Sequence, residues 1–503
     1  MFKHIVSTVV LCGVASASAA AMPGQSPVAE AASSASQPRW TCHVADGALA
    51  RRQQVERNVL PRVAFIGESR PATIEARMVR HRAPALSVAV IRDGELDWSA
   101  AWGRLQADGE AADCDTLFQA GSLAKPATVL AALRMQQQGV VDLDADIGTY
   151  LSSWHLPAGA QTQANPVTLR NLFKHTAGIT PGGYDGYARD QPMPTDVRTV
   201  QAEAPANARK VEVLEEPGTS LRYSGGGYTV AEIALQDRLR QPFEQIMRTW
   251  LTVPVGMKQA DFTQPPPAAN EDHMARGYRQ DGSAVPGGWH NHPEQAAAGL
   301  WATASDMATF LIEIRKGWQG RSTIFTRESI RELLADPIDD HAYGFRLIGQ
   351  GDRVFLTHYG GTAGYRAGMT INLESGNGAV YLVDSDNGSE LGLEFLAAVA
   401  EAYGWPMFRT ERVERATQAV EVLESLTGRY GFGDGPAVSV VHERDALTLV
   451  FPNGDRYAMT PIVGAPREFI HPDTGVRASF DGEGADTTLQ LYGQTGRRLA
   501  GGE

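Results

Sequence analysis

The chain has 503 residues and a formal net charge of −13, and 20% of its residues are charged. A chain of this length exceeds one typical hydrophobic core, so two or three domains are expected. The negative charge, together with the lack of a basic run, argues against non-specific binding to nucleic acids.

The N-terminus has the pattern of a secretory leader over residues 1–21. Lys3 precedes an apolar run from Ile5 to Val14, and small residues follow in the expected cleavage region. Residues 22–59 are expected to form a flexible N-terminal segment, since their beginning is rich in Ala, Ser and Pro. No later run is long and apolar enough to suggest a membrane span, so a periplasmic or secreted location is predicted.

Two cysteines remain after the leader, Cys42 and Cys114. An oxidising compartment permits a disulfide between them. Two unpaired thiols are the alternative, and in neither case is a catalytic cysteine expected.

The first predicted strands precede the most informative stretch. The segment from Ala85 to Trp98 has two apolar, β-rich runs on either side of Asp93-Gly94. This pattern is a strong hairpin signal.

The most informative stretch runs from Phe118 to Leu133 and holds Ser122 and Lys125 in an S-x-x-K array. Ala and Leu dominate it after Gly121, which predicts a helix, and residues three apart share one helix face. Lys125 is the only charged residue between Ser122 and Leu133, so the helix is expected to be buried and the amine desolvated. Such an amine, when partly neutral, can take the proton of a neighbouring hydroxyl. The array is short, however, and also occurs by chance.

Three further candidate positions favour structural roles. The acidic stretch over residues 141–147 could suggest a cation site, but Ca²⁺ loops need more oxygen ligands and a glycine at the bend, so a solvated connection is favoured. His175 comes near the end of a short helix over residues 167–178, where capping or packing is favoured over catalysis as a base. Asp306 is expected to be a first-turn helix acid, because hydroxyl residues that can cap the helix precede it.

A loop and a glycine-rich turn surround the next candidate, Tyr223. Residues 181–215 are rich in Gly, Pro, Asp and Ala, which predicts a long loop of the kind that borders sites. The three glycines from Gly225 to Gly227 could resemble a phosphate cradle, but no G-K-[ST] ending follows them. A tight turn that presents Tyr223 before a helix is the favoured interpretation.

The next part of the chain predicts the rest of a sheet. His358 lies in an expected strand over residues 353–361, which ends in Gly360 and Gly361. Two more strands, over 369–373 and 379–383, and a closing helix over 390–403 follow along the chain.

A different pattern begins after residue 408. Residues 409–423 are predicted to be a charged linker. Residues 424–503 then contain short alternating strands with tight turns such as Asn453-Gly454, which favours a small antiparallel barrel or sandwich. A role in packing or stability is the simplest expectation for this last domain.

The order and spacing of Ser122-Leu-Ala-Lys125, Tyr223 and His358-Tyr-Gly360 resembles that of the serine β-lactamase and penicillin-binding-protein superfamily. The resemblance is nearest to the branch of class C β-lactamases, D-alanyl-D-alanine carboxypeptidases and esterases. It implies an α+β fold, in which an antiparallel sheet flanked by helices and a mainly helical subdomain span residues 60–408. It also suggests that residues 424–503 form a β-barrel, lipocalin-like domain.

The resemblance implies roles for individual residues. Ser122 would be the nucleophile that forms an acyl-enzyme, Lys125 would accept or shuttle its proton, and Tyr223 would assist as acid or base. The oxyanion hole would consist of the backbone N–H groups of Ser122 and Gly361. His358 would shape the field around the acyl group.

Two positions depart from the family pattern. Gly225 replaces the asparagine of the Y-x-N motif, so a side-chain amide that would bind a substrate amide is missing, although Gly225 and Gly360 remain the expected substrate-binding positions. His358 stands where many members carry the lysine of K-T-G, so its grip on a carboxylate is expected to weaken as the pH rises. The literal Ser-Asp-Asn at 385–387 follows the His358 element and is interpreted as a turn.

The sequence therefore predicts an exported serine hydrolase that acts through a Ser122 acyl-enzyme on small esters or D-amino-acid peptides and amides, with weak or absent β-lactamase activity. The alternative is a non-catalytic protein of the same fold that binds peptidoglycan or a partner. No cofactor or metal is expected, and the sequence contains no H-E-x-x-H ligand pattern. The expected partner is a small-molecule or peptide substrate, while its identity and the oligomeric state stay open.

Overall fold

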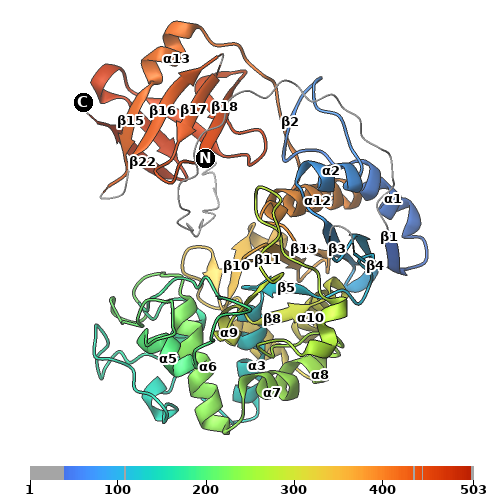
Figure 1. The fold of residues 1–503 in the computed structure, drawn as a ribbon, viewed down its shortest axis with the longest axis vertical. Coiled ribbons are helices and arrows are strands. Elements are labelled where there is room, and N and C mark those ends of the chain that lie inside the picture. The colour runs from blue at the N-terminus through green and yellow to red at the C-terminus, as the bar shows by residue number, and fades with distance from the viewer. Residues whose placement is uncertain (1–38, 107–108, 434–436, 445, 500–503) are drawn as a thin grey trace. The chain divides into compact units, whose positions relative to one another are not determined.

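The computed structural model describes residues 39–106, 109–433, 437–444 and 446–499. The expected leader over residues 1–21 lies outside the described residues. The chain divides into two compact units. Among the described residues, the first unit, here called the sheet unit, comprises the chain from 39 to 57 and from 73 to 407, and the second, the barrel unit, comprises residues 58–72 and the chain from 408 to 499 (Figure 1).

The sheet unit is organised around one eight-stranded sheet in which neighbouring strands are antiparallel. The hairpin predicted around Asp93-Gly94 is confirmed, and both residues have positive φ, as a tight two-residue hairpin turn requires. In spatial order the strands are β1 (Arg39–Val44), β4 (Glu95–Gly103), β3 (Ala85–Arg92), β13 (Gly378–Val383), β12 (Tyr365–Asn372), β11 (Phe355–Thr362), β10 (Phe345–Ile348) and β9 (His341–Ala342).

Helices cover both sides of this sheet (Figure 1). Helix α12 (Gly388–Tyr403) packs on β12 and β13, with α1 (Leu49–Arg57) and α2 (Ile74–Arg80) against it. Helix α10 (Ala304–Trp318) packs on β3, β4 and β13 from the other side. Strands β3 and β13, which lie between these two layers of helices, are almost completely buried. Their burial on both faces agrees with their nearly continuous apolar sequences.

The remainder of the sheet unit is mainly helical and shares its hydrophobic core with the sheet. Two short strand pairs lie within it, β5 (Phe118–Gly121) with β8 (Leu300–Ala302) and β6 (Tyr187–Ala188) with β7 (His290–Asn291). The helices are α3 (Ala124–Gln137), α4 (Leu169–Phe173), α5 (Asp196–Gln201), α6 (Gly225–Leu239), α7 (Phe243–Met247), α8 (Val253–Val255), α9 (Gln295–Ala298) and α11 (Arg327–Glu332).

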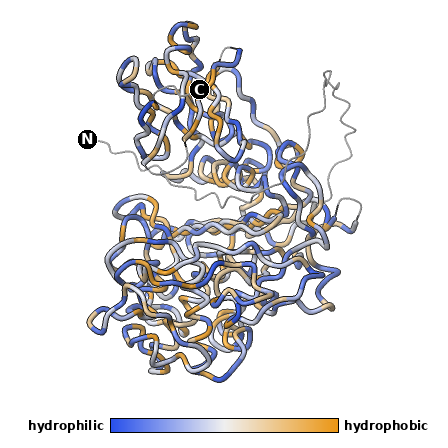
Figure 2. Tube along the Cα trace, turned by 60° about the vertical axis from the view of Figure 1, so that its left-hand side comes forward, coloured by the Kyte–Doolittle hydropathy of each residue, from blue (hydrophilic) through white to orange (hydrophobic). Residues whose placement is uncertain are grey.

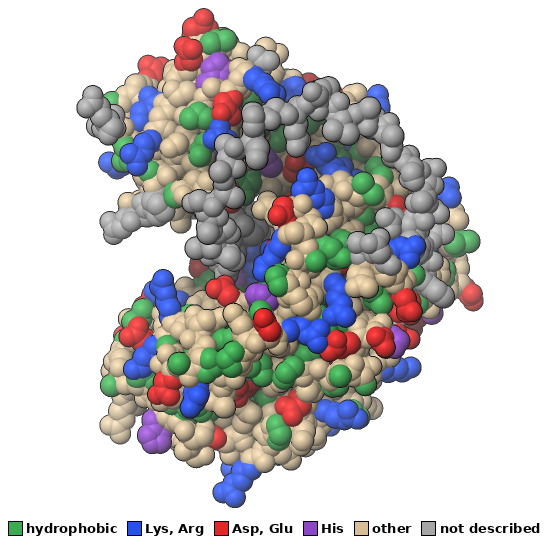
Figure 3. All heavy atoms as spheres, in the orientation of Figure 1, with side chains coloured by type: hydrophobic (Ala, Val, Ile, Leu, Met, Phe, Trp, Pro, Cys, Tyr) green, Lys and Arg blue, Asp and Glu red, His purple; other side chains and the backbone are tan. Residues whose placement is uncertain are grey.

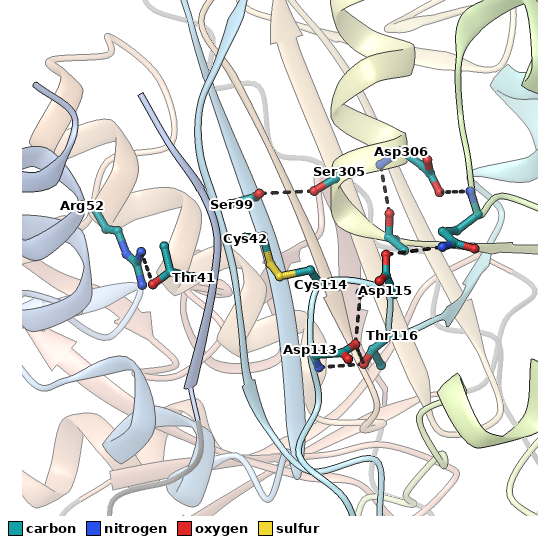
Figure 4. The surroundings of a disulfide bond; sticks show 12 residues. Thr41, Cys42, Arg52, Ser99, Asp113, Cys114, Asp115, Thr116, Ser305 and Asp306 are labelled. Atoms are coloured by element: carbon teal, nitrogen blue, oxygen red, sulfur yellow. Dashed lines mark hydrogen bonds between the residues drawn. A yellow bond between two sulfur atoms is a disulfide. The ribbon is translucent and has the colours of Figure 1, made fainter. Parts of the chain in front are cut away.

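A disulfide joins Cys42 to Cys114, so the open question about these two thiols is answered in favour of a bond (Figure 4). Cys42 lies on β1 at the edge of the sheet, and Cys114 lies in the segment that leads into β5. The bond closes a span of 72 residues. It therefore ties the first strand of the sheet unit to the segment just before Ser122.

The barrel unit contains a closed antiparallel barrel of eight strands. Of the two architectures predicted for this domain, a barrel or a sandwich, the barrel is therefore confirmed. Hydrophobic and hydrophilic residues alternate along its chain in Figure 2, as expected for strands with one buried face. Leu423 and Leu426 of α13 (Val420–Leu426) belong to its core. The strands are β15 (Gly428–Gly431), β16 (Val438–Glu443), β17 (Ala446–Val450), β18 (Arg456–Ile462), β19 (Ala465–Ile470), β20 (Arg477–Asp481), β21 (Thr488–Leu491) and β22 (Gln494–Arg498).

The unit boundaries differ from those expected from the sequence. Residues 58–72 belong to the barrel unit, because β2 (Val63–Phe65) pairs in parallel with β14 (Glu411–Val413). The same pairing places an ordered strand inside the expected linker 409–423. Likewise, the expected flexible range 22–59 ends in an ordered strand and helix, β1 and α1.

The surface shows no concentration of one sign of charge on the face drawn in Figure 3, where positive and negative side chains are interspersed. In the part of the chain that the structure describes, no helix has the length and apolar character needed to cross a membrane.

Candidate active site

Ser122 lies in the tight turn between β5 and α3. Gly121 precedes it with a φ of 52°, and a Cβ atom at this glycine would lie 2.9 Å from the backbone nitrogen of Gly361. The N–H of Lys125 donates to the carbonyl of Ser122 at 3.0 Å, which fixes the first turn of the helix. The strand, turn and helix together place the backbone of Ser122 beside the end of β11.

The Lys125 amine reaches Ser122 as the three-residue spacing predicts. Its Nζ lies 3.1 Å from Ser122 Oγ and also donates to the carbonyl of Ala297 at 2.8 Å. The residue is 3% exposed. Its ammonium also lies 5.1 Å from the ring centroid of Tyr223 and 5.6 Å from that of Tyr228. The amine is therefore held away from bulk water by a hydroxyl, a carbonyl and two aromatic faces.

Tyr223 is the second group on Ser122. Its hydroxyl donates to Ser122 Oγ at 3.1 Å. It comes just before Ser224, whose side chain caps α6 by accepting the N–H of Gly227. The predicted contact of Tyr223 with Ser122 is therefore present, but the glycines that follow begin α6 itself and do not form a separate turn before the helix.

His175 has a packing role beside Tyr223. Its side chain is buried, and its Nδ1 accepts the N–H of Ser224 at 3.1 Å. Burial, followed by the nearby Lys125 charge, lowers the pKa of His175 well below its usual value. A neutral imidazole whose Nδ1 accepts a backbone hydrogen bond is suited to supporting Tyr223 and not to removing a proton from Ser122.

His358 lies on β11, within the strand predicted for it. It is 5% exposed, and burial, with a smaller effect of Lys125, lowers its pKa to about 3. Its Nδ1 has no hydrogen-bond partner among the described residues, and the imidazole is hydrogen-bonded to the backbone of Gly344. This imidazole is therefore neutral at pH 7, as expected for a histidine in place of the family's lysine, and it already loses its charge well below neutral pH.

Gly360 and Gly361 bring the end of β11 close to Ser122. A Cβ atom at Gly360 would lie 2.0 Å from the carbonyl oxygen of Ala120 and 3.2 Å from the backbone nitrogen of Ser122. Only a glycine fits at such an approach. The end of β11 therefore lies beside the turn that carries Ser122.

The three glycines at the start of α6 are explained by the loop that covers them. The N–H of Gly225 donates to the carbonyl of Gly182 at 2.9 Å, and that of Gly226 donates to the carbonyl of Pro181 at 3.0 Å. A Cβ atom at Gly226 would lie 2.2 Å from the carbonyl oxygen of Thr180. These amides are engaged within the protein, so the glycines do not form a phosphate cradle.

Several other sequence candidates have structural roles. Asp306 accepts the backbone N–H groups of Lys258 and Gln259 at the start of α10, as a first-turn acid does. Asp144, from the acidic stretch, is paired with Arg170. The Ser-Asp-Asn sequence at 385–387 forms the turn between β13 and α12, as expected.

Sequence reasoning missed the residues that complete the site from distant segments. Ala297 receives the Lys125 amine through its backbone carbonyl, for which the sequence carries no signal. Glu232 holds α9, the helix that contains Ala297, by accepting the N–H of Ala296 at 2.8 Å. The ring of Tyr184 lies over Gly225. The only sequence signal for this residue is that it lies in the long loop predicted over residues 181–215.

A beta-lactamase family model matches residues 71–403, which is more than half of the chain. The chain belongs to the serine β-lactamase and penicillin-binding-protein superfamily. It is 21% identical to penicillin-binding protein 4* of Bacillus subtilis (strain 168) over 412 residues, 75% of this chain and 86% of that protein. The predicted superfamily is therefore confirmed, and with it the general class of serine hydrolases.

Two solved structures of this superfamily share the fold. The octameric penicillin-binding protein homologue from Pyrococcus abyssi aligns with a TM-score of 0.57 at 18% identity, over 84% of this chain and 98% of that chain. The beta-lactamase/D-alanine carboxypeptidase from Yersinia pestis, complexed with citrate, aligns with a TM-score of 0.52 at 20% identity, over 71% of this chain and 100% of that chain. At these identities the likeness shows the fold alone, and it confirms the predicted α+β architecture.

Proposed function

We propose that this protein is an exported serine hydrolase that forms an acyl-enzyme on Ser122. Its substrates are small esters or D-amino-acid peptides and amides, and its β-lactamase activity is weak or absent. The observation that carries the proposal is the convergence of two groups on one hydroxyl. Lys125 Nζ and Tyr223 OH each lie 3.1 Å from Ser122 Oγ.

The arrangement supports acylation by direct proton transfer. Ser122 Oγ attacks the substrate carbonyl while its proton passes to a neutral Lys125 amine or to a Tyr223 phenolate. The same pair then returns a proton to the leaving alcohol or amine. A water molecule attacks the resulting ester, with the pair again as base, and releases the carboxylic acid and the free Ser122 hydroxyl.

The backbone beside Ser122 supplies the rest of the proposed chemistry. The N–H groups of Ser122 and Gly361 stabilise the oxyanion of the tetrahedral intermediate. Gly360 allows this close approach and lines the substrate path together with Gly225. His358 contributes a neutral, buried wall on the Lys125 side and brings no charge to the acyl group.

Export is part of the proposal and is supported by two observations. The sequence begins with a leader-like segment, and the disulfide between Cys42 and Cys114 fits an oxidising compartment such as the periplasm.

The proposal is tested by labelling the purified protein with a fluorescent fluorophosphonate. Wild type and a surface control, Ser152→Ala, are expected to be labelled, whereas Ser122→Ala is not. Lys125→Ala is expected to lose at least about 1000-fold in ester kcat/KM, because the serine loses its proton acceptor.

An unlabelled wild type without ester turnover would contradict the hydrolase. Muropeptide or protein binding that persists in Ser122→Ala would then favour the non-catalytic binding protein.

A further inference from the structure

The ring of Tyr184 lies over the position where Gly225 lacks a side chain. A Cβ atom built on Gly225 would lie 3.1 Å from Cε2 and 3.2 Å from Cδ2 of that ring. A longer side chain would have to displace the ring. Gly225 is buried and comes two residues after Tyr223, whose hydroxyl contacts Ser122. Tyr184 therefore occupies the space that an asparagine side chain at 225 would need.

The polar end of Tyr184 is engaged elsewhere. Its hydroxyl shares a hydrogen bond of 2.9 Å with Oγ1 of Thr229, one turn further along α6. The two ring atoms nearest to Gly225 are both carbons. At this point Tyr184 consequently offers the site an apolar ring edge and no hydrogen-bond donor or acceptor.

Backbone hydrogen bonds fix the segment that carries the ring. The carbonyls of Pro181 and Gly182 accept the first two N–H groups of α6, from Gly226 and Gly225. The side chain of Ser224 also donates to Pro181, at 3.2 Å. Because these bonds tie the start of the loop to the first turn of α6, they hold the segment that carries the ring in place beside Gly225.

We propose that Tyr184 and Gly225 together form a specificity element that selects substrates by their acyl group. The preferred class is simple carboxylic esters, whose acyl group is apolar, over esters and amides of N-acylated D-amino acids. An acylamino group placed against the ring edge loses hydrogen bonds to water and finds no partner, whereas an alkyl chain loses none. This inference rests on the proposed Ser122 hydrolase activity.

Two esters with the same leaving group test the element, p-nitrophenyl butanoate and the p-nitrophenyl ester of N-acetyl-D-alanine. Wild type is expected to favour butanoate by about tenfold or more in kcat/KM. The double variant Tyr184→Ala/Gly225→Asn clears the space and supplies an amide, so it is expected to lower this preference by about tenfold. Tyr187→Phe, a tyrosine in the same loop but outside the element, is the matched control and should keep the wild-type preference.

A second variant keeps the test decisive if the double variant does not fold. Tyr184→Phe retains the ring edge and loses only the bond to Thr229, so it should keep the preference for butanoate. Equal or greater turnover of the N-acetyl ester by wild type would overturn the inference, as would an unchanged preference in a folded double variant.

Fluorophosphonate labelling separates this inference from the proposed function. If Ser122 is labelled but the preference is absent, only the specificity element fails. If Ser122 is not labelled and neither ester is turned over, the proposed hydrolase fails, and the specificity element fails with it.

Discussion

The imidazole of His175 lies against the phenol of Tyr223, with ring centroids 4.3 Å apart and an interplanar angle of 32°. The carbonyl of His175 also accepts the N–H of Arg222 at 2.8 Å, while its Nδ1 accepts that of Ser224. One residue thus holds the chain on both sides of Tyr223. Its φ of 58° is a conformation that asparagine also tolerates and that a leucine does not favour.

His175→Leu is expected to lower kcat for ester hydrolysis by about tenfold with little change in KM, because Tyr223 is no longer held against Ser122. The Ser224 N–H also loses its partner, which costs about 1–3 kcal/mol of stability. His175→Asn should recover most of kcat, since its amide oxygen can accept the same N–H. Equal losses in the two variants, measured with melting temperatures alongside, would show that the position does not act through Tyr223.

His358 is expected to make the sheet unit sensitive to acid. Its pKa is about 3 in the fold and near 6.5 when unfolded, so between these values the unfolded chain binds more protons. The stability from this residue is therefore present above pH 6.5 and is lost as the pH falls, by about 2 kcal/mol at pH 5. Tryptophan fluorescence in urea measures it, because all nine tryptophans lie between residues 40 and 405, in the sheet unit.

The comparison is made with His358→Gln at pH 7 and pH 5. The variant should lose less stability on acidification than wild type does. If both proteins lose the same amount, the imidazole is not kept neutral by burial. No inflection in log kcat/KM between pH 5 and 8 is expected from this residue.

Asp196 is expected to have the opposite effect. Burial raises its pKa to about 6, despite a hydrogen bond from Gln236. The fold therefore binds a proton that the unfolded chain has already released, and stability falls as the pH rises from about 4 to about 6. The loss is at most about 3 kcal/mol. Asp196→Asn should remove it, so that urea unfolding of the variant is less dependent on pH in this window; an unchanged pH dependence would contradict the buried, raised carboxyl.

The disulfide is expected to contribute about 2–4 kcal/mol to the stability of the sheet unit. Cys42→Ser/Cys114→Ser should therefore lower its melting temperature, and dithiothreitol should lower that of wild type but not that of the variant. Thiol titration of the unfolded mature protein should find no free thiol before reduction. Two titratable thiols at that stage would contradict the bond.

Local spacing was enough to predict the contact between Ser122 and Lys125, because residues three apart share a helix face. The order of motifs added Tyr223, whose position depends on the cap of one helix. The carbonyl of Ala297 could not be predicted, since it lies 172 residues beyond Lys125 and a backbone group has no sequence signature. The lowered pKa of His358 could not be predicted, because it follows from burial by segments that only the fold brings together.

The unit boundaries were missed for a related reason. Composition places a boundary where the local pattern changes, near residue 408. The pairing of β2 with β14 joins segments about 350 residues apart, so neither segment alone reveals it. The glycines at 225 and 226 were interpreted as a turn before the helix, but they form the start of α6, and the reason for them lies in the loop around Tyr184 that packs over them.

Because residues 58–72 belong to the barrel unit, the described part of the chain crosses between the two units three times, near residues 57, 72 and 407. A single protease cut near residue 407 would therefore not release the barrel unit. Strand β2 of the N-terminal fragment would remain paired with β14 of the C-terminal fragment. Truncation there would expose Val63 and Phe65 to water, because the residues on which they pack, Ile462 and Ile470, would be removed. A soluble catalytic fragment would have to replace residues 58–72 with a short connector as well as end before the barrel.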